Sequence, residues 1–315
     1  MVTDTRVTTG SPRAARVWLG PDQPVELRSA VLEAGGILVP QAEANVFIWA
    51  RDGTPIGSLR EALTPSVEWV QLDAAGVDDW FRAGVIDSQR IWTCAQGVYA
   101  LDVAEHVVGF ILAAARRLGE GARRRTWSDL TGARLLGGTV GIVGGGGIAH
   151  ETIRLLRPFG VRILVVSRSG RRIAGADMVV RAGDLHRVLP ELDYLVLAAP
   201  LTRETEGMIS TDELRLLPPT SWIINVGRGR LIDTDALVAA LDVKQIGGAC
   251  LDVTDPEPLP DRHPLWGRDN VIITAHAANP WAGHLVVLAK RIQANVQRFI
   301  LGRPLLGVVD TKRGY

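Results

Sequence analysis

The segment "TVGIVGGGGIAHETIRLLRPFG" constrains the fold of this chain more than any other. An apolar run typical of a strand leads into a glycine turn, and a run typical of a helix follows. Gly144, Gly146 and Ala149 match G-x-G-x-x-G/A, in which the glycines allow a tight turn and close approach of a pyrophosphate, and the small third residue lets the helix pack on the strand. The N–H groups of Gly147 and Ile148 would face the phosphates. The segment predicts a dinucleotide site; the alternative is a glycine-rich turn that binds no ligand.

Further apolar runs follow this segment without polar alternation: "RILVVS", "LDYLVLAAP", "SWIINVG", "IGGACLDV" and "NVIITAH". Strands that are covered by helices on both faces have this character. Six or seven such strands, separated by helical segments, predict a doubly wound parallel sheet of the Rossmann type.

The chain before residue 100 holds a second set of strand-like runs: "RVWLG", "GILVP", "ANVFIWA", "VEWVQLDAAG" and "IWTCA". They predict a smaller parallel α/β unit. A long helix is expected over 100–124, and a strongly periodic helix from about residue 283 is expected to pack back on the first unit. We therefore predict a discontinuous domain, 1–101 with 284–315, and a dinucleotide-binding domain, 102–283.

Composition excludes several classes of protein. The net charge of +1 gives no general attraction to nucleic acid or anionic membranes, and the basic run 116–125 is interpreted as a solvated helix face or a subunit contact. No apolar run approaches the roughly 20 residues of a membrane span. The N-terminal "MVTDTRVTTGSPRAA" lacks the apolar core of a signal peptide and is expected to be disordered. Cys94 and Cys250 both lie in apolar runs and are expected to be free buried thiols. No metal site is predicted. The expected location of the protein is the cytoplasm.

The second strand of the predicted dinucleotide domain ends in "VVSRSG". A carboxylate at its end would bind the adenosine ribose of NAD, but the chain has Ser167, Arg168 and Ser169 there. A carboxylate would repel a 2′-phosphate, whereas a guanidinium can pair with it and two hydroxyls can bind it. The sequence therefore favours NADP over NAD; alternatively, Arg168 stacks on the adenine and makes no phosphate contact.

Three later segments each place one reactive side chain at or after a strand end: Arg228 in "NVGRGRLID", Glu257 in "LDVTDPEPLP" and His276 in "VIITAHAANP". For a 2-oxo acid that meets a reduced nicotinamide, His276 can donate a proton to the carbonyl oxygen. Glu257 would orient the ring and favour its protonated form, and Arg228 would hold the substrate carboxylate. Taken singly, the three could be a surface arginine, a solvated acid and a structural histidine.

At these residues the chain resembles the D-isomer-specific 2-hydroxyacid dehydrogenase family. The glycine turn, "PLTRETEGMI", "INVGRGRLID", "GGACLDVTDPEPLP", "HPLW" and the final histidine occur in the family's order. The resemblance implies a Rossmann coenzyme domain inserted into a smaller flavodoxin-like α/β substrate domain, and a homodimer built largely through the coenzyme domains.

The resemblance also implies roles for individual residues. Arg228, Glu257 and His276 would be the catalytic set, and the backbone N–H groups of Ala75 and Gly76 would bind the substrate carboxylate. Asp252 would contact the nicotinamide amide. The cofactor cleft would be lined by Pro200, Thr205, Val226 and Gly227. The segment "AHAANP" and the bulky Trp281 depart from the family pattern, and Trp281 could line the substrate pocket or pack under the last helix.

We therefore expect an NADPH-favouring reductase of a small 2-oxo acid such as glyoxylate or hydroxypyruvate, because "SRS" is similar to the NADP-dependent members that act on these acids. The alternatives are another substrate within the family, such as 3-phosphoglycerate, phosphite or a bulkier 2-hydroxy acid, and a dinucleotide-sensing protein like the corepressors that share this fold.

Overall fold

The computed structural model describes residues 13–50, 53–127 and 129–315, so most of the N-terminal stretch expected to be disordered lies outside the described residues. The chain divides into two compact units. Unit 1 comprises the residues up to Tyr99 together with Pro280–Tyr315, and unit 2 comprises Ala100–Asn279. Unit 2 thus interrupts unit 1 in the sequence.

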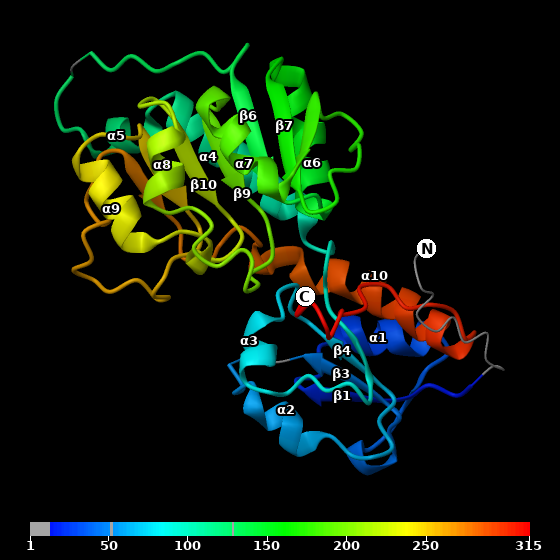
Figure 1. Ribbon diagram of the computed structural model, residues 1–315. Helices are drawn as coiled ribbons and strands as arrows, with labels where there is room; N and C mark the ends of the chain where they lie inside the picture. The colour runs from blue at the N-terminus through cyan, green and yellow to red at the C-terminus, as the bar shows by residue number, and fades with distance from the viewer. Residues whose placement is uncertain (1–12, 51–52, 128) are drawn as a thin grey trace. The chain divides into compact units, whose positions relative to one another are not determined.

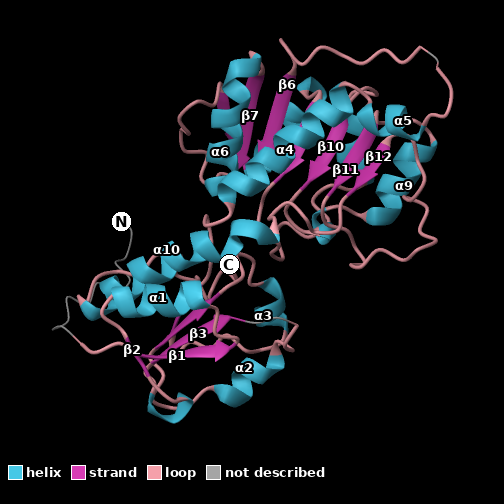
Figure 2. Ribbon diagram, turned by 180° about the vertical axis from the view of Figure 1, so that it is seen from behind, coloured by secondary structure: helices cyan, strands magenta, loops and turns pink. Residues whose placement is uncertain are grey.

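Unit 1 contains a parallel sheet with the strand order β2-β1-β3-β4-β5. Its strands are β1 (Arg16–Pro21), β2 (Ile37–Leu38), β3 (Val46–Ala50), β4 (Trp69–Leu72) and β5 (Ile91–Thr93). Its helices are α1 (Val25–Glu33), α2 (Gly57–Ala62), α3 (Asp78–Arg82) and α10 (Trp281–Ile300). Helices α1 and α10 pack together on one face of the sheet, and α2 lies on the other (Figures 1 and 2). The order 2-1-3-4-5 is that of flavodoxin-like folds and confirms the predicted class.

Unit 2 contains a seven-stranded parallel sheet with the order β12-β11-β10-β9-β6-β7-β8. Its strands are β6 (Thr139–Val143), β7 (Arg162–Ser167), β8 (Met178–Arg181), β9 (Tyr194–Leu197), β10 (Trp222–Asn225), β11 (Gly248–Leu251) and β12 (Val271–Ile273). Counted within the unit, the order is 3-2-1-4-5-6-7, a doubly wound sheet whose order reverses between β6 and β9. Strands β9 and β11 are buried along their whole length, which is why they lack polar alternation.

Helices cover both faces of the larger sheet. They are α4 (Ala100–Ala115), α5 (Leu118–Arg123), α6 (Gly147–Leu156), α7 (Leu185–Val188), α8 (Thr211–Leu216) and α9 (Thr234–Asp242). Helices α4 and α6 pack against each other on one face, and α7, α8 and α9 cover the other (Figures 1 and 2). Helix α6 follows the glycine turn and buries Ala149, Ile153 and Leu156 at helical spacing. Cys250, on β11, and Cys94, in unit 1, are free and buried.

The prediction of one continuous helix over 100–124 is wrong. The helix breaks at Arg117, whose backbone has a left-handed φ of 52°. The carbonyl oxygen of Ala115, the last residue of α4, accepts a hydrogen bond of 2.7 Å from the N–H of Ala133. A later segment thus supplies a donor to a carbonyl group that has no partner within the helix. Among the described residues, no helix combines the length and the apolar character that a bilayer crossing requires.

Candidate active site

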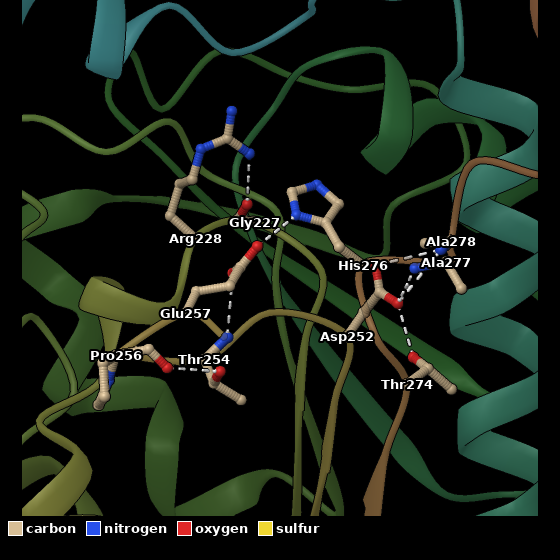
Figure 3. Close-up of polar contacts among 10 residues, drawn as sticks. All are labelled: Gly227, Arg228, Asp252, Thr254, Pro256, Glu257, Thr274, His276, Ala277 and Ala278. Carbon is tan, nitrogen blue, oxygen red and sulfur yellow. Dashed lines mark hydrogen bonds and ion pairs between the residues drawn. The ribbon is translucent and has the colours of Figure 1, made fainter. Parts of the chain in front are cut away.

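The predicted catalytic residues of unit 2 all follow carboxyl ends of parallel strands. Arg228 follows β10, Glu257 lies in the loop after β11, and His276 lies after β12. These three strands are neighbours in the sheet, so their carboxyl ends lie along one edge. The structure brings the three side chains together: those of His276 and Glu257 face each other, and the Arg228 guanidinium lies beside them and donates to the Gly227 carbonyl oxygen at 2.8 Å (Figure 3).

His276 and Glu257 form a hydrogen-bonded pair, with 2.7 Å between Nδ1 and Oε1. Because a carboxylate only accepts hydrogen bonds, Nδ1 carries a proton and donates it to Glu257. This hydrogen bond raises the pKa of His276, against the opposing effects of burial and of the Arg228 charge. In turn, the hydrogen bond from His276 lowers the pKa of Glu257. The side chains are 54% and 42% exposed, so we assign the pair no large contribution to folding stability.

Arg228 is held beside this pair by its own backbone and by the Glu257 loop. The buried Asn225 side chain donates to the Arg228 carbonyl oxygen at 2.9 Å and accepts from the Gly227 N–H at 3.1 Å. A side chain on Gly229 would lie 1.9 Å from the Thr254 carbonyl oxygen. The backbone after Arg228 therefore packs directly on the loop that carries Glu257, and the glycine makes this approach possible.

Asp252 organises the loop that carries His276. Its carboxylate is 3% exposed and accepts hydrogen bonds from the Thr274 hydroxyl at 2.6 Å and from the backbone N–H groups of Ala277 and Ala278 at 2.7 and 3.1 Å. The His276 N–H donates to the Asp252 carbonyl oxygen at 2.9 Å. His276 itself has a left-handed φ of 50°, a conformation that costs a non-glycine residue energy and that these contacts stabilise. The sequence did not predict this role of Asp252.

The glycine turn has the geometry that its pattern predicts. Gly144 has φ +118°, and a side chain there would lie 2.5 Å from the Ala198 carbonyl oxygen. Gly146 caps α6, and a Cβ at this position would meet no described atom within 4 Å. Ala149 is buried against the sheet, while Gly147 and Ile148 lie in the first turn, where N–H groups lack intrahelical partners. The turn therefore leaves room and donors for an anionic group between β6 and β9.

The predicted adenosine end of the site lies at the end of β7. Ser167 is its last residue, and its Oγ accepts a hydrogen bond from the Gly170 N–H at 3.2 Å. Arg168 and Ser169 follow and are exposed. Arg181 pairs with Ser167 in the register of β7 and β8, and a Cβ on Gly170 would lie 2.7 Å from Arg181 Cγ. Arg181 is a cation beside this loop that could not be placed from the sequence, because only the register of the two strands brings it there.

The remaining predicted cofactor residues also follow carboxyl ends of this sheet. Thr205 Oγ1 donates to the Pro200 carbonyl oxygen at 2.7 Å, so the two lie together in the loop after β9. Val226 and Gly227 follow β10, and the Val226 N–H donates to the Leu197 carbonyl oxygen.

Ala75 and Gly76 belong to unit 1, in the loop after β4, where the Ala95 N–H fixes the Ala74 carbonyl oxygen at 2.8 Å. Their part in the site stays a prediction. Trp281 begins α10, and its side chain lies outside the described residues.

Comparison with known proteins decides the family. Residues 108–278, more than half of the chain, match the family described as "D-isomer specific 2-hydroxyacid dehydrogenase, NAD binding domain". The chain belongs to this family. It is therefore an oxidoreductase with a nicotinamide dinucleotide domain, as the resemblance implied.

The glyoxylate reductase of Aeropyrum pernix is 36% identical over 223 residues, which are 67% of each chain. The solved structure of a family member from Xanthobacter autotrophicus with NADPH and MES is similar at a TM-score of 0.84 and 26% identity, covering 96% of this chain and 100% of that chain. An NADPH-dependent glyoxylate/hydroxypyruvate reductase from Sinorhizobium meliloti, solved with NADP and sulfate, has a TM-score of 0.81 at 26% identity over 96% and 100%. A Lactobacillus delbrueckii member solved with NAD shares the fold at 20% identity over 94% and 100%, with a TM-score of 0.73, so the fold does not determine the coenzyme.

Proposed function

We propose that this 2-hydroxyacid dehydrogenase is an NADPH-dependent reductase of a small 2-oxo acid, with glyoxylate and hydroxypyruvate as the first candidates. The observation that carries the proposal is the His276–Glu257 pair, joined at 2.7 Å beside the Arg228 guanidinium. An acid, a carboxylate that orients it and a cation for an anionic substrate are the groups that this reduction requires.

His276 supplies the proton. When Nδ1 donates to Glu257, the second proton of the imidazolium is on Nε2, which is the atom left to face a substrate. As the C–H bond forms at the substrate's carbonyl carbon, the carbonyl π electrons move to the oxygen, which takes the Nε2 proton and becomes the hydroxyl. Glu257 keeps the ring oriented throughout and stabilises its positive charge.

Arg228 binds the substrate carboxylate and polarises the carbonyl group. A guanidinium can pair with a carboxylate through two parallel hydrogen bonds, which fixes the plane of the substrate. The backbone N–H groups of Ala75 and Gly76 would add neutral donors to the same carboxylate. A phosphorylated substrate would call for further cations near this loop, and "DAAGVDD" offers none.

The residues of unit 2 fit a nicotinamide dinucleotide, which would supply the hydride. The open space at Gly146 and the first turn of α6 suit a pyrophosphate. At the adenosine end, Arg168 and Arg181 provide positive charge and Ser167 and Ser169 provide hydroxyls, a set suited to a 2′-phosphate. That the Sinorhizobium meliloti relative is NADPH-dependent supports this preference.

Further roles belong to the same proposal. Unit 2 would bind the coenzyme and unit 1 would contribute substrate contacts, the roles predicted for domain 102–283 and for domain 1–101 with 284–315. The protein would act as a homodimer formed largely through unit 2, with no nucleic-acid partner.

The test is a rate panel with NADPH and NADH against glyoxylate, hydroxypyruvate, bulkier 2-oxo acids and 3-phosphohydroxypyruvate, followed by the absorbance of the reduced nicotinamide. We expect the highest kcat/KM for NADPH with the smallest acids. Folded protein without turnover on any acid would refute the proposal, and higher turnover with NADH would refute the coenzyme preference. A dinucleotide sensor would keep its function in Arg228→Ala, whereas the reductase would lose turnover while still binding NADPH.

A further inference from the structure

His106 lies on α4 and contacts Thr274, in the segment that leads to His276. Its Nε2 is 3.1 Å from the Thr274 hydroxyl and 3.7 Å from Asp252 Oδ1. The ring meets Phe110 edge-on, with 4.3 Å between the ring centroids. The side chain is 23% exposed, so neither its position nor its hydrogen bond is that of a solvated surface histidine.

The protons of this network can be assigned from the chemistry of its members. The Asp252 carboxylate only accepts, so the Thr274 hydroxyl, 2.6 Å away, donates its proton to Asp252. That hydroxyl has no second proton to give, so the His106 Nε2 must be the donor to Thr274 Oγ1. Burial lowers the pKa of His106, against the opposing effect of Asp252, so the neutral ring with its single proton on Nε2 is favoured. The protonated ring also carries Nε2–H, so the donor is present in both states.

The network ends at the backbone of the His276 loop. The oxygen of Asp252 that accepts from Thr274, Oδ1, also accepts from the Ala277 N–H at 2.7 Å. Asp252 thus links the Thr274 hydroxyl to the residue that follows His276. A shift of Asp252 would move the left-handed turn at His276 and with it the imidazole.

We propose that His106 is a positioning residue, which fixes the His276 loop through a directed chain of hydrogen bonds from Nε2–H to Thr274 and from Thr274 to Asp252. The inference rests on the proposed role of His276 as the acid of the reaction. It assigns a function to a histidine of helix α4 that does not touch the paired side chains of the site.

Two substitutions separate the hydrogen bond from simple packing. His106→Gln keeps an N–H donor near the place of Nε2, whereas His106→Phe keeps the ring against Phe110 and removes the donor. We expect His106→Gln to retain most of the wild-type kcat. We expect His106→Phe to lose about three- to tenfold in kcat, the range of one net hydrogen bond, with KM for NADPH unchanged. The reverse order, with Phe active and Gln impaired, would overturn the proposal in favour of packing.

The hydroxyl between the two groups gives a second test. If the chain runs through Thr274, then Thr274→Val and His106→Phe remove the same connection, and the double variant should lose little more kcat than Thr274→Val alone. Thr274→Ser keeps the hydroxyl and serves as the matched control. Losses of kcat that multiply in the double variant would contradict a shared chain.

The tautomer of His106 can be measured without any variant. Long-range 1H–15N correlation spectra of the full protein labelled at histidine should assign the proton of neutral His106 to Nε2. A proton on Nδ1 would overturn the network even if the enzyme is fully active. Failure of the wild-type protein to reduce any 2-oxo acid, with Nε2–H observed, would instead count against the proposed function.

Discussion

Substitutions at two glycines after β6, Gly144 and Gly146, should separate the effect on folding stability from the effect on coenzyme binding. Gly144 has φ +118°, and a Cβ there would lie 2.5 Å from the Ala198 carbonyl oxygen and 2.8 Å from its carbon. The left-handed half of the map costs an alanine about 1–2 kcal/mol, and overlap with rigid backbone adds about 1–3 kcal/mol. Gly144→Ala should therefore lower the free energy of unfolding by about 2–5 kcal/mol, or Tm by about 5–15 °C.

Gly146→Ala should leave the folding stability intact and weaken the binding of NADPH. The backbone of Gly146 has φ −89° and ψ −164°, which an alanine adopts freely, and the new methyl group would meet no described atom within 4 Å. We expect the stability to be unchanged or to rise by about 0.4–1 kcal/mol. The methyl group would instead occupy the space through which a pyrophosphate reaches the backbone, so we expect the affinity for NADPH to fall at least tenfold.

Thermal unfolding with and without NADPH measures both effects. At a coenzyme concentration of about 100 Kd the wild-type protein gains about 2.7 kcal/mol, and a tenfold weaker variant gains only about 1.4 kcal/mol at the same concentration. Gly183→Ala, another glycine with open space and outside the site, is the matched control and should show the full gain. An unchanged Tm for Gly144→Ala, or a full NADPH gain for Gly146→Ala, would refute the reasoning.

Three further variants test the chemistry of the site. His276→Ala should lower kcat by about 10²- to 10⁴-fold while NADPH binding is kept, measured by steady-state rates and coenzyme titration; a loss under tenfold would exclude it as the acid. Glu257→Gln should shift the decrease of the reduction rate at high pH to lower pH. The hydrogen bond that raises the pKa of His276 loses its charged partner, so His276 loses its acid form at a lower pH. A decrease at the same pH as in the wild type would show that it does not report the titration of His276. Ser167→Asp should raise the KM for NADPH about tenfold or more and leave the KM for NADH near its wild-type value, since a carboxylate repels a 2′-phosphate. Equal effects on the two KM values would contradict the assignment of Ser167 to the 2′-phosphate site.

The sequence predicted the sheets because their strands are buried on both faces. Continuous apolar runs such as "YLVL" and "GACL", which are too short for helices and alternate with helical segments, are typical of strands buried on both faces. Strand β8 gave a weaker signal, because an edge strand of four residues is only half buried and its run "MVVR" is short. The register of that strand was nevertheless what placed Arg181 beside Ser167.

The geometry around His276 could not be predicted from residue types. A left-handed backbone is expected first at glycine; histidine adopts it more often than most other residues, but in so few cases that the residue type alone does not predict it at His276. The hydrogen bonds from Ala277 and Ala278 to Asp252 depend on that conformation, so this role of Asp252 was hidden as well. In the same way, the break in helix α4 depends on Ala133, which is distant in the sequence. In each case a contact across the chain overrides a local preference.

The half-exposed state of the His276–Glu257 pair has a chemical consequence. The desolvation energy of two buried opposite charges can exceed the energy of their attraction, and transfer of the proton, which gives two neutral groups, is then favoured. At the carboxyl edge of the sheet, with solvent contact, Glu257 can stay ionised and His276 can carry both protons. Below the raised pKa of His276, the imidazolium of the resting enzyme therefore already carries the proton that reduction consumes. Above that pKa, the neutral imidazole is the base that alcohol oxidation requires. Arg228 lowers the pKa of the same ring, so the position of this crossover depends on the balance between one anion and one cation. A substrate carboxylate bound to Arg228 would offset the cation and raise the pKa of His276 further, which would strengthen the acid form when the oxo acid is bound.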